Sequence, residues 1–244
     1  MKRITGLAAF LLAYPTAALA APGLGEEVYG THIEKGEIEL EARYDRLAGG
    51  ADNGEDVIKL EAGYGVSDRF KVAILSEFEK EPGNGRKAEE IGVEAIYRLG
   101  SAGPIDFALY GEYAIGLNGN PDGIEGKLLM QHREGPWDMR LNLTAAKALG
   151  TGEPVEFSYA ASADVAATES LRLGIEAFGD LGNGDKLFPY AEHFVGPTAK
   201  LRIAPGDHDD DEEGFTIQAG YLFAVGKARE DTDGQLRLAL EFEF

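Results

Sequence analysis

The last nine residues, "LRLALEFEF" (Leu236–Phe244), decide the fold class of this chain. Apolar side chains occupy the even positions of this stretch, ending on Phe242 and Phe244, and Arg237, Glu241 and Glu243 occupy odd ones. Apolar residues that recur at every second position indicate a β-strand with one apolar and one polar face. Chain ends are usually polar and frayed. We therefore expect this terminal strand to be held in a sheet that has an apolar surrounding.

The same period of two recurs along the rest of the chain. About twelve segments of roughly ten residues show it, at 37–44, 58–64, 70–78, 91–97, 105–115, 124–130, 137–143, 155–165, 171–175, 186–203, 215–223 and 236–244. Segments of this length and pattern are typical of membrane-spanning β-strands. The sequence therefore predicts an all-β fold, an antiparallel up-and-down transmembrane β-barrel of about twelve strands. Only 186–203 is irregular, and Gly196-Pro197 predicts a bulge there that switches the two faces.

The amino-terminal residues have the features of a secretory signal peptide. Lys2 and Arg3 precede an apolar run over 4–13, and Ala18-Leu19-Ala20 forms a small-x-small cleavage pattern. The expected organisation is a signal peptide at 1–20, an amino-terminal periplasmic tail at 21–35 and a barrel domain at 36–244. The chain has no cysteine, which leaves no disulfide and no site for lipid attachment.

Short turns alternate with longer loops rich in Gly, Asn and Asp. Short turns are expected at 65–68, 133–136 and 167–170, and longer loops at 47–55, 81–86, 117–122, 149–154, 179–185 and 227–233. In outer-membrane barrels the short turns are periplasmic, and an even number of strands then puts both termini on the periplasmic side. Aromatic residues gather at both ends of the predicted strands, as at two membrane interfaces.

A soluble exported β-sandwich is the competing fold. Its strands are usually only five or six residues long, and its edge strands carry protective charges. The apolar positions of this chain carry almost no charge over about twelve longer strands, which favours the membrane barrel. The net charge of −20 also argues against a nucleic-acid partner, which would require a basic surface.

The terminal strand resembles the carboxy-terminal signal of Gram-negative outer-membrane proteins, and "YGVSDRF" (Tyr64–Phe70) is similar to the tight turns of porin-like and transporter barrels. The chain also resembles barrels of the meta-pathway phenol-degradation family. The resemblance implies that Phe242 and Phe244 act as an assembly signal read by the barrel assembly machinery. It implies residence in the outer membrane, among outer-membrane lipid, after export through a cleaved signal peptide.

With the apolar face toward lipid, the other face lines the lumen. The candidate lumen-lining residues are Glu39, Glu41, Arg43, Lys59, Glu61, Lys71, Glu77, Glu94, Glu112, Lys127, Arg140, Arg172, Glu176 and Arg237. Acids outnumber bases on this face as a whole, which favours a narrow channel for small polar or cationic solutes. The alternative is a closed structural barrel in which these charges pair. No loop is long enough for an obvious plug, although residues 21–36 could fold into the lumen.

A lipid-modifying barrel enzyme is a further alternative. Such an enzyme needs a nucleophilic serine beside a base, and His193 has Ser158 and Ser162 on the preceding segment but no recognisable motif. We expect no catalytic residue, cofactor or metal. The acidic run "DHDDDEEG" (Asp207–Gly214) is expected to be a solvated turn rather than a cation site, since it lacks the spacing of a calcium loop.

Overall fold

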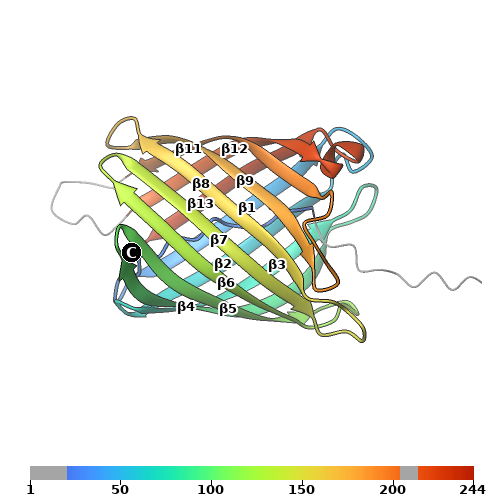
Figure 1. Cartoon of the computed structure of the whole chain (residues 1–244), viewed down its shortest axis with the longest axis horizontal. Helices are drawn as coiled ribbons and strands as arrows, with labels where there is room; N and C mark the ends of the chain where they lie inside the picture. Colours follow the sequence, from blue (N-terminus) through green and yellow to red (C-terminus); the bar gives the residue numbers. More distant parts are fainter. Residues whose placement is uncertain (1–20, 204–213) are drawn as a thin grey trace, which may run out of the picture.

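A closed antiparallel β-barrel forms the body of the described part of the chain (Figure 1). The computed structural model describes residues 21–203 and 214–244. Each of twelve long strands pairs with its neighbours in sequence, and β13 pairs with β1 to complete the ring. The predicted fold class and strand number are confirmed. The signal peptide at 1–20 and most of the acidic run at 207–214 lie outside the described residues.

The strands are 10 to 16 residues long, apart from a two-residue pair in one hairpin. They are β1 (Ile38–Ala48), β2 (Asp56–Ser67), β3 (Phe70–Lys80), β4 (Lys87–Ala102), β5 (Ile105–Gly116), β6 (Gly123–Glu134), β7 (Trp137–Ala148), β8 (Glu156–Ala166), β9 (Leu171–Asn183), β10 (Lys186–Leu187), β11 (Glu192–Ile203), β12 (Gly214–Gly226) and β13 (Gly234–Glu243). A short 3₁₀-helix, η1 (Lys227–Glu230), lies between β12 and β13. Within the described residues no helix is both long and apolar enough to cross a membrane.

The terminal strand that decides the fold class also closes the barrel. Leu40 lies opposite Phe242 and Tyr44 opposite Leu238 in the β1–β13 ladder. Beyond the ladder, the Phe244 N–H donates to the Ile38 carbonyl at 2.9 Å, and the Ile38 N–H donates to the Phe244 carbonyl at 3.1 Å. The backbone of this chain end is therefore fully paired, which accounts for its lack of fraying.

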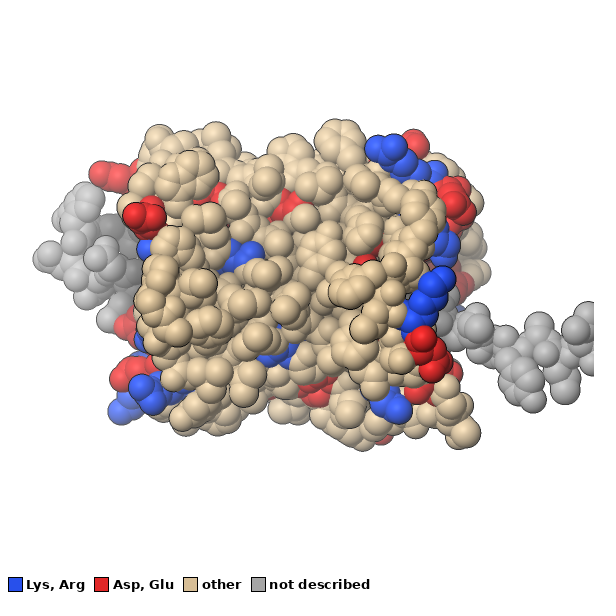
Figure 2. Space-filling model, in the orientation of Figure 1, with Lys and Arg blue, Asp and Glu red and all other residues tan. Residues whose placement is uncertain are grey.

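The outer surface is a band of exposed apolar side chains. Residues such as Ile74, Val93 and Ile175 are more than half exposed, in the middle of strands where a soluble protein would bury them. Figure 2 shows charge gathered at the two ends of the barrel and an almost uncharged surface between them. Exposed Tyr64, Tyr97 and Trp137 lie toward the short-turn end. This distribution matches a surface that faces hydrocarbon.

The predicted face switch at Gly196-Pro197 is wrong. The β11–β12 ladder keeps one register across this point, with Val195 opposite Phe223 and Thr198 opposite Gly220. Phe194 breaks the alternation for another reason, because it points into the barrel, is 1% exposed and belongs to an interior apolar cluster. An apolar residue on the inward face therefore accounts for the change of parity, without a reversal of the two faces.

Candidate functional site: the lumen and its amino-terminal tail

Inward-facing charges line the barrel wall. Of the fourteen candidate residues, eight are buried, namely Glu41, Arg43, Lys59, Glu61, Glu94, Lys127, Glu176 and Arg237. The other six, Glu39, Lys71, Glu77, Glu112, Arg140 and Arg172, are partly buried. All fourteen lie on the face opposite the exposed apolar band. Further acids share this face, in Asp45, Glu125, Asp138, Asp164 and Glu241, so the described part of the lumen carries an excess of acid.

The wall charges are brought together in local groups rather than in one site. Arg43 Nη2 lies 2.7 Å from Glu61 Oε2, and its Nε lies 2.7 Å from Glu41 Oε1. Lys71 Nζ lies 2.6 Å from Glu39 Oε1. Further ion pairs join Lys59 to Glu77, Arg237 to both Glu176 and Asp45, and Arg140 to Asp138. Arg172 stands apart near the short-turn end, where it pairs with Asp164.

The segment that precedes β1 runs through the lumen. Ala21, Leu24 and Val28 pack against Leu47 and Val57 near the long-loop end of the barrel. At the other end the Gly36 N–H donates to the Gly65 carbonyl at 2.7 Å, beside the short β2–β3 turn. We call residues 21–36 the tail. Its described path lies inside the barrel, in contrast to the expected periplasmic tail at 21–35.

Side chains from the wall hold the backbone of the tail by hydrogen bonds. The Tyr29 N–H donates to Asn142 Oδ1 at 2.7 Å, and Asn142 Nδ2 donates to the Tyr29 carbonyl at 3.1 Å. Thr31 donates through both its N–H and its hydroxyl to Gln131 Oε1, at 2.9 and 3.0 Å. Asp45 accepts the Gly25 N–H at 2.8 Å. The wall thus supplies the partners that a neighbouring strand would give an extended chain.

Arginines bind the carbonyls of the same segment. Arg43 Nη1 donates to the Gly25 carbonyl at 3.0 Å, and Arg140 Nη1 donates to the Val28 carbonyl at 3.1 Å. Arg237 donates to the carbonyls of Gly23 and Glu26. These three candidate lumen residues therefore contact the backbone of the tail rather than open space. Hydrogen bonds from charged donors are stronger than those between neutral groups.

Tyr29 occupies the middle of the lumen. Its ring centroid lies 4.9 Å from that of Tyr110, and Lys127 Nζ lies 4.9 Å from both centroids. Its hydroxyl lies 3.2 Å from Glu94 Oε2. A lysine this close to two aromatic faces is stabilised by cation–π attraction. Lys127 also pairs with Glu26 of the tail at 2.6 Å and with Glu125 of its own strand at 2.9 Å.

Apolar residues complete the packing of the tail, and the sequence analysis missed them. One cluster holds Leu24, Val28, Phe178, Phe194 and Leu222, and a second holds Tyr29, Ile33, Ile96, Tyr110 and Leu129. The wall members of these clusters are apolar residues on the polar face of their strands. The sequence did contain a signal for this packing, namely apolar residues at inward-facing positions, which a water-filled lumen does not explain. These residues are Leu47, Ile96, Leu129 and Leu222.

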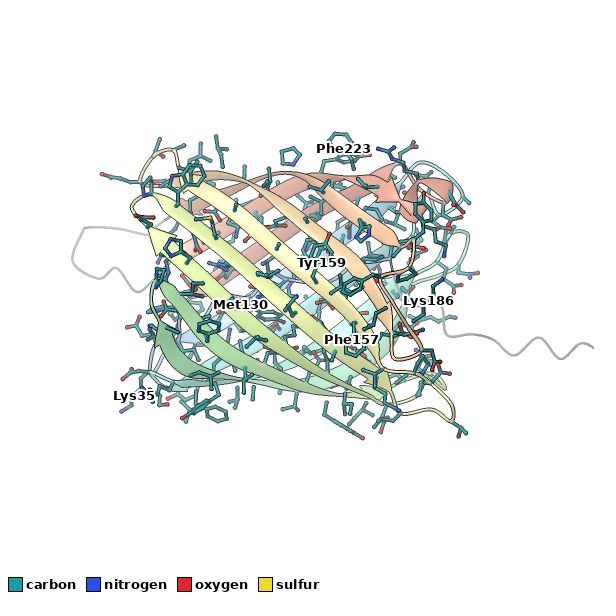
Figure 3. The ribbon with its side chains drawn as sticks, viewed as in Figure 1. Lys35, Met130, Phe157, Tyr159, Lys186 and Phe223 are labelled. Atoms are coloured by element: carbon teal, nitrogen blue, oxygen red, sulfur yellow. The ribbon has the colours of Figure 1, made fainter. Side chains whose placement is uncertain are left out.

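A cavity of about 490 Å³ opens at the short-turn end, where the tail leaves the lumen. Its lining is mostly charged and comprises His32, Glu34, Lys35, Glu37, Arg133, Arg202, Glu243 and the terminal Phe244. Figure 3 shows Lys35 at this end of the barrel. Burial and the nearby carboxylate of Glu243 raise the pKa of Glu37, which lies just before β1. The cavity forms a polar vestibule below the tail.

Two groups of carboxylates have the spacing of a cation site. The oxygens of Glu27, Glu41 and Glu61 lie within 4.8 Å of one another, and so do those of Glu37, Glu39 and Glu243. Arg43 pairs with all three members of the first group. Lys71 pairs with Glu39 in the second group. Side-chain cations of the protein thus already neutralise part of each group.

His193 does not lie in a nucleophile–base arrangement with a described serine. Its Nδ1 lies 3.4 Å from the Tyr159 hydroxyl, and the two rings are 5.9 Å apart. Ser158 lines an apolar pocket on the outer wall. The described geometry around His193 therefore matches an aromatic contact rather than the arrangement that activates a serine.

Comparisons with known proteins place the chain by its fold. No family profile matches it, and no curated protein matches its sequence. Among solved structures, the COG4313 outer membrane channel from Pseudomonas putida F1 superposes with a TM-score of 0.57 at 13% identity, over 91% of this chain and 98% of that one. The NanC porin superposes with a TM-score of 0.56 at 9% identity, over 84% of this chain and 98% of that porin. The KdgM porin superposes with a TM-score of 0.53 at 10% identity, over 84% of this chain and 99% of that porin.

The chain has the fold of porin-like outer-membrane barrels. At this level of identity the likeness concerns the fold alone. The similar structures are channels and porins, and nothing in their likeness assigns catalysis to this chain. What the lumen does must be argued from its own residues.

Proposed function

We propose that this protein is a narrow outer-membrane channel of a Gram-negative bacterium for small polar or cationic solutes. The observation that carries the proposal is a lumen lined with charge, in acid excess, inside a barrel whose outer surface is apolar. Side chains fill the interior of an eight-stranded barrel, whereas a sixteen-stranded barrel leaves an open channel. The interior of a barrel of about twelve strands is intermediate in width. The tail narrows this intermediate lumen further.

The charge of the lumen argues for the class of solute. Glu26 and Glu27 of the tail add acid to a wall already rich in it. Rings of acidic side chains favour cations over anions. The KdgM porin has been solved in complex with oligogalacturonate, a polyanion. An acidic lumen disfavours a polyanion, so we propose a small neutral or cationic solute for this chain.

The partners follow from the location. The apolar band is suited to contact with outer-membrane lipid, and the alternating terminal strand that ends on Phe242 and Phe244 fits recognition by the barrel assembly machinery. Export through a cleaved signal peptide at 1–20 belongs to the same proposal.

Single-channel recording in planar bilayers tests the channel. We expect small, steady conductance steps and a reversal potential in a KCl gradient that shows cation preference. The competing function is a closed structural barrel, which the many contacts of the tail favour. Absence of conductance at every voltage, from protein shown to be folded by its heat-modifiable migration in gels, would overturn the channel and leave the closed barrel.

A further inference from the structure

An apolar pocket lies on the outer wall of the barrel, away from the lumen. It has a volume of about 260 Å³ and is lined by Leu143 of β7, Phe157 and Ser158 of β8, Leu181 of β9, and Leu187 and Phe188 of the following hairpin, with Thr144 beside them. The β9–β10 hairpin forms one side of this pocket and the ends of β7 and β8 form the other. Figure 3 shows Phe157 toward the long-loop end of the barrel.

The hairpin is held in place against the wall. The Gly184 N–H donates to the Val155 carbonyl at 2.9 Å, and the Phe188 N–H donates to the Leu181 carbonyl at 2.7 Å. Phe188 adopts a φ of 52°, in the left-handed region that non-glycine residues rarely occupy. Its side chain is 77% exposed at the pocket. Backbone strain that leaves a large aromatic residue in the open is a sign of a functional contact.

Two lysines flank the pocket on the loop side. Lys147 lies opposite Ile124, whose side chain is exposed on the outer face, so Lys147 faces the same way. It lies two residues beyond Ala145, which is paired with Phe157. Lys186 follows the Gly184 turn and immediately precedes Leu187. Neither ammonium group has an ion-pair partner among residues 21–203 and 214–244.

We propose that this pocket binds one acyl chain of an anionic lipid of the surrounding bilayer, with Lys147 and Lys186 contacting the headgroup. The pocket is smaller than the roughly 300 Å³ that a compact drug-sized ligand needs, and a slender hydrocarbon chain suits its size. Its place on the lipid-facing surface brings acyl chains to it at high concentration. Unpaired lysines at a membrane interface attract anionic headgroups.

A second copy of the chain is a poorer occupant. A stable protein interface buries about 800 Å² on each partner, whereas this patch comprises one hairpin and two strand ends. The inference rests on the proposed membrane location of the barrel, and it does not depend on conduction through the lumen.

Native mass spectrometry of the purified full-length mature protein tests the site. The detergent-solubilised protein is titrated with phosphatidylglycerol, and separately with zwitterionic phosphatidylcholine. We expect one retained phosphatidylglycerol and weaker retention of phosphatidylcholine. Leu187→Ser with Phe188→Ser should weaken binding of both lipids about tenfold, because each buried methylene contributes to acyl binding. Lys147→Gln with Lys186→Gln should remove the preference between the two headgroups while leaving acyl binding.

Matched controls lie elsewhere on the barrel. Phe223→Ser removes an exposed aromatic residue of β12 that does not line the pocket, and Lys87→Gln removes an exposed lysine at the long-loop end of β4. Both should bind lipid as the wild type does. Equal retention in the Leu187/Phe188 variant and the wild type, or no retained lipid in the wild type, would overturn the site. A mass of two chains would assign the patch to a second copy instead.

Conductance of the same variants separates this inference from the proposed function. The Leu187/Phe188 variant should conduct as the wild type does, since the hairpin lies outside the lumen. A barrel that never conducts but retains the lipid would refute the channel and leave the lipid site standing.

Discussion

Asn142 is the residue that most directly fixes the tail in the lumen. It is fully buried, and its amide group donates to and accepts from the backbone of Tyr29. Asn142→Ala leaves both backbone groups of Tyr29 without this partner, which costs about 1–3 kcal/mol of unfolding free energy. We expect a lower urea midpoint and, because the tail is loosened, a larger single-channel conductance.

The control for this substitution is Asn118→Ala. Asn118 is exposed in the β5–β6 loop, where its Nδ2 donates to the Ala88 carbonyl at 2.7 Å. Neither stability nor conductance should change much there. An Asn142→Ala channel with the conductance of the wild type would show that the tail does not set the width of the path.

Arg43 is the cation that holds three carboxylates together, of which two are buried and one is partly exposed. It pairs with Glu27, Glu41 and Glu61. Arg43→Met removes the ion-pair partner of Glu27 and Glu41, whereas Glu61 keeps Lys71 Nζ at 3.8 Å. Removal of one partner from a buried ion pair costs about 3–5 kcal/mol. Urea unfolding followed by the fluorescence of the single tryptophan, Trp137, measures the loss. Arg43→Lys should recover part of the stability, and no difference between Met and Lys would contradict this role.

At the scale of elements, the loop between β1 and β2 predicts that the proposed channel depends on pH. Burial, together with the nearby acids Glu79, Asp52, Glu81 and Glu192, raises the pKa of Glu55 to about 7. Glu55 is therefore neutral below this pH and negative above it. Cation preference, measured from reversal potentials, should rise as the pH passes from 5 to 8.

The raised pKa of Glu55 also determines how the stability of the folded protein changes with pH. The folded loop binds the proton of Glu55 more tightly than the unfolded chain does, so this group favours the folded state increasingly as the pH falls from about 7 toward the ordinary glutamate value. Glu55→Gln removes both dependences at this position. If the selectivity of Glu55→Gln follows pH as steeply as that of the wild type, other carboxylates govern it.

The end of β13 combines a backbone role with the proposed assembly signal. Phe244→Ala keeps both backbone hydrogen bonds to Ile38 but loses the ring, whereas deletion of Phe244 loses all of them. We expect less barrel in the outer membrane for both variants if the ring is recognised during assembly. Heat-modifiable migration of membrane fractions measures this. Normal assembly of Phe244→Ala with failure of the deletion would assign the role to the backbone alone.

The strands were predictable because a membrane barrel imposes one simple rule on them. Leu40, Leu60, Ile74 and Leu240 face lipid, so they had to be apolar, and their alternation with charge gave both the fold class and the strand number. The prediction failed at Phe194 because this apolar residue packs in an interior cluster. Alternation in the sequence shows which positions of a strand are apolar, but it does not show whether one apolar residue contacts lipid or the interior.

At the scale of the whole molecule, the tail lies in the path that the proposed channel would offer to solutes. The chain has no cysteine, so an engineered disulfide has no competing thiol. Thr31→Cys with Gln131→Cys replaces two side chains whose oxygens are 3.0 Å apart. If solutes pass only when the tail moves, the oxidised protein should conduct less than the reduced protein.

Single-channel recording before and after addition of a reductant makes this comparison on the same channel. The single variants Thr31→Cys and Gln131→Cys provide the controls, since neither can form the bridge. Identical conductance in the oxidised and reduced double variant would mean that solutes pass beside a stationary tail.

The tail was the part of the site that the sequence predicted least. Its residues have no long period-two pattern, and its partners Asn142, Gln131 and Arg140 lie 100 or more positions away. Each contact depends on closure of the barrel, which brings β6 and β7 over a segment that precedes β1. The alternation along each strand predicted which charged residues line the wall. It did not predict that several of them form hydrogen bonds with the backbone of the tail.

The path of the tail determines on which side of the bilayer the amino-terminal end of the described chain lies. Twelve strands alone would leave both chain ends on one side of the bilayer, yet the tail adds a thirteenth crossing. Ala21 therefore lies toward the long-loop end, whereas Phe244 lies at the opposite end beside Ile38. In the proposed outer-membrane topology, a peptide epitope joined to Ala21 would face the exterior of the cell, and one joined to the carboxy terminus would face the periplasm. One polypeptide would thus present its two ends to two compartments.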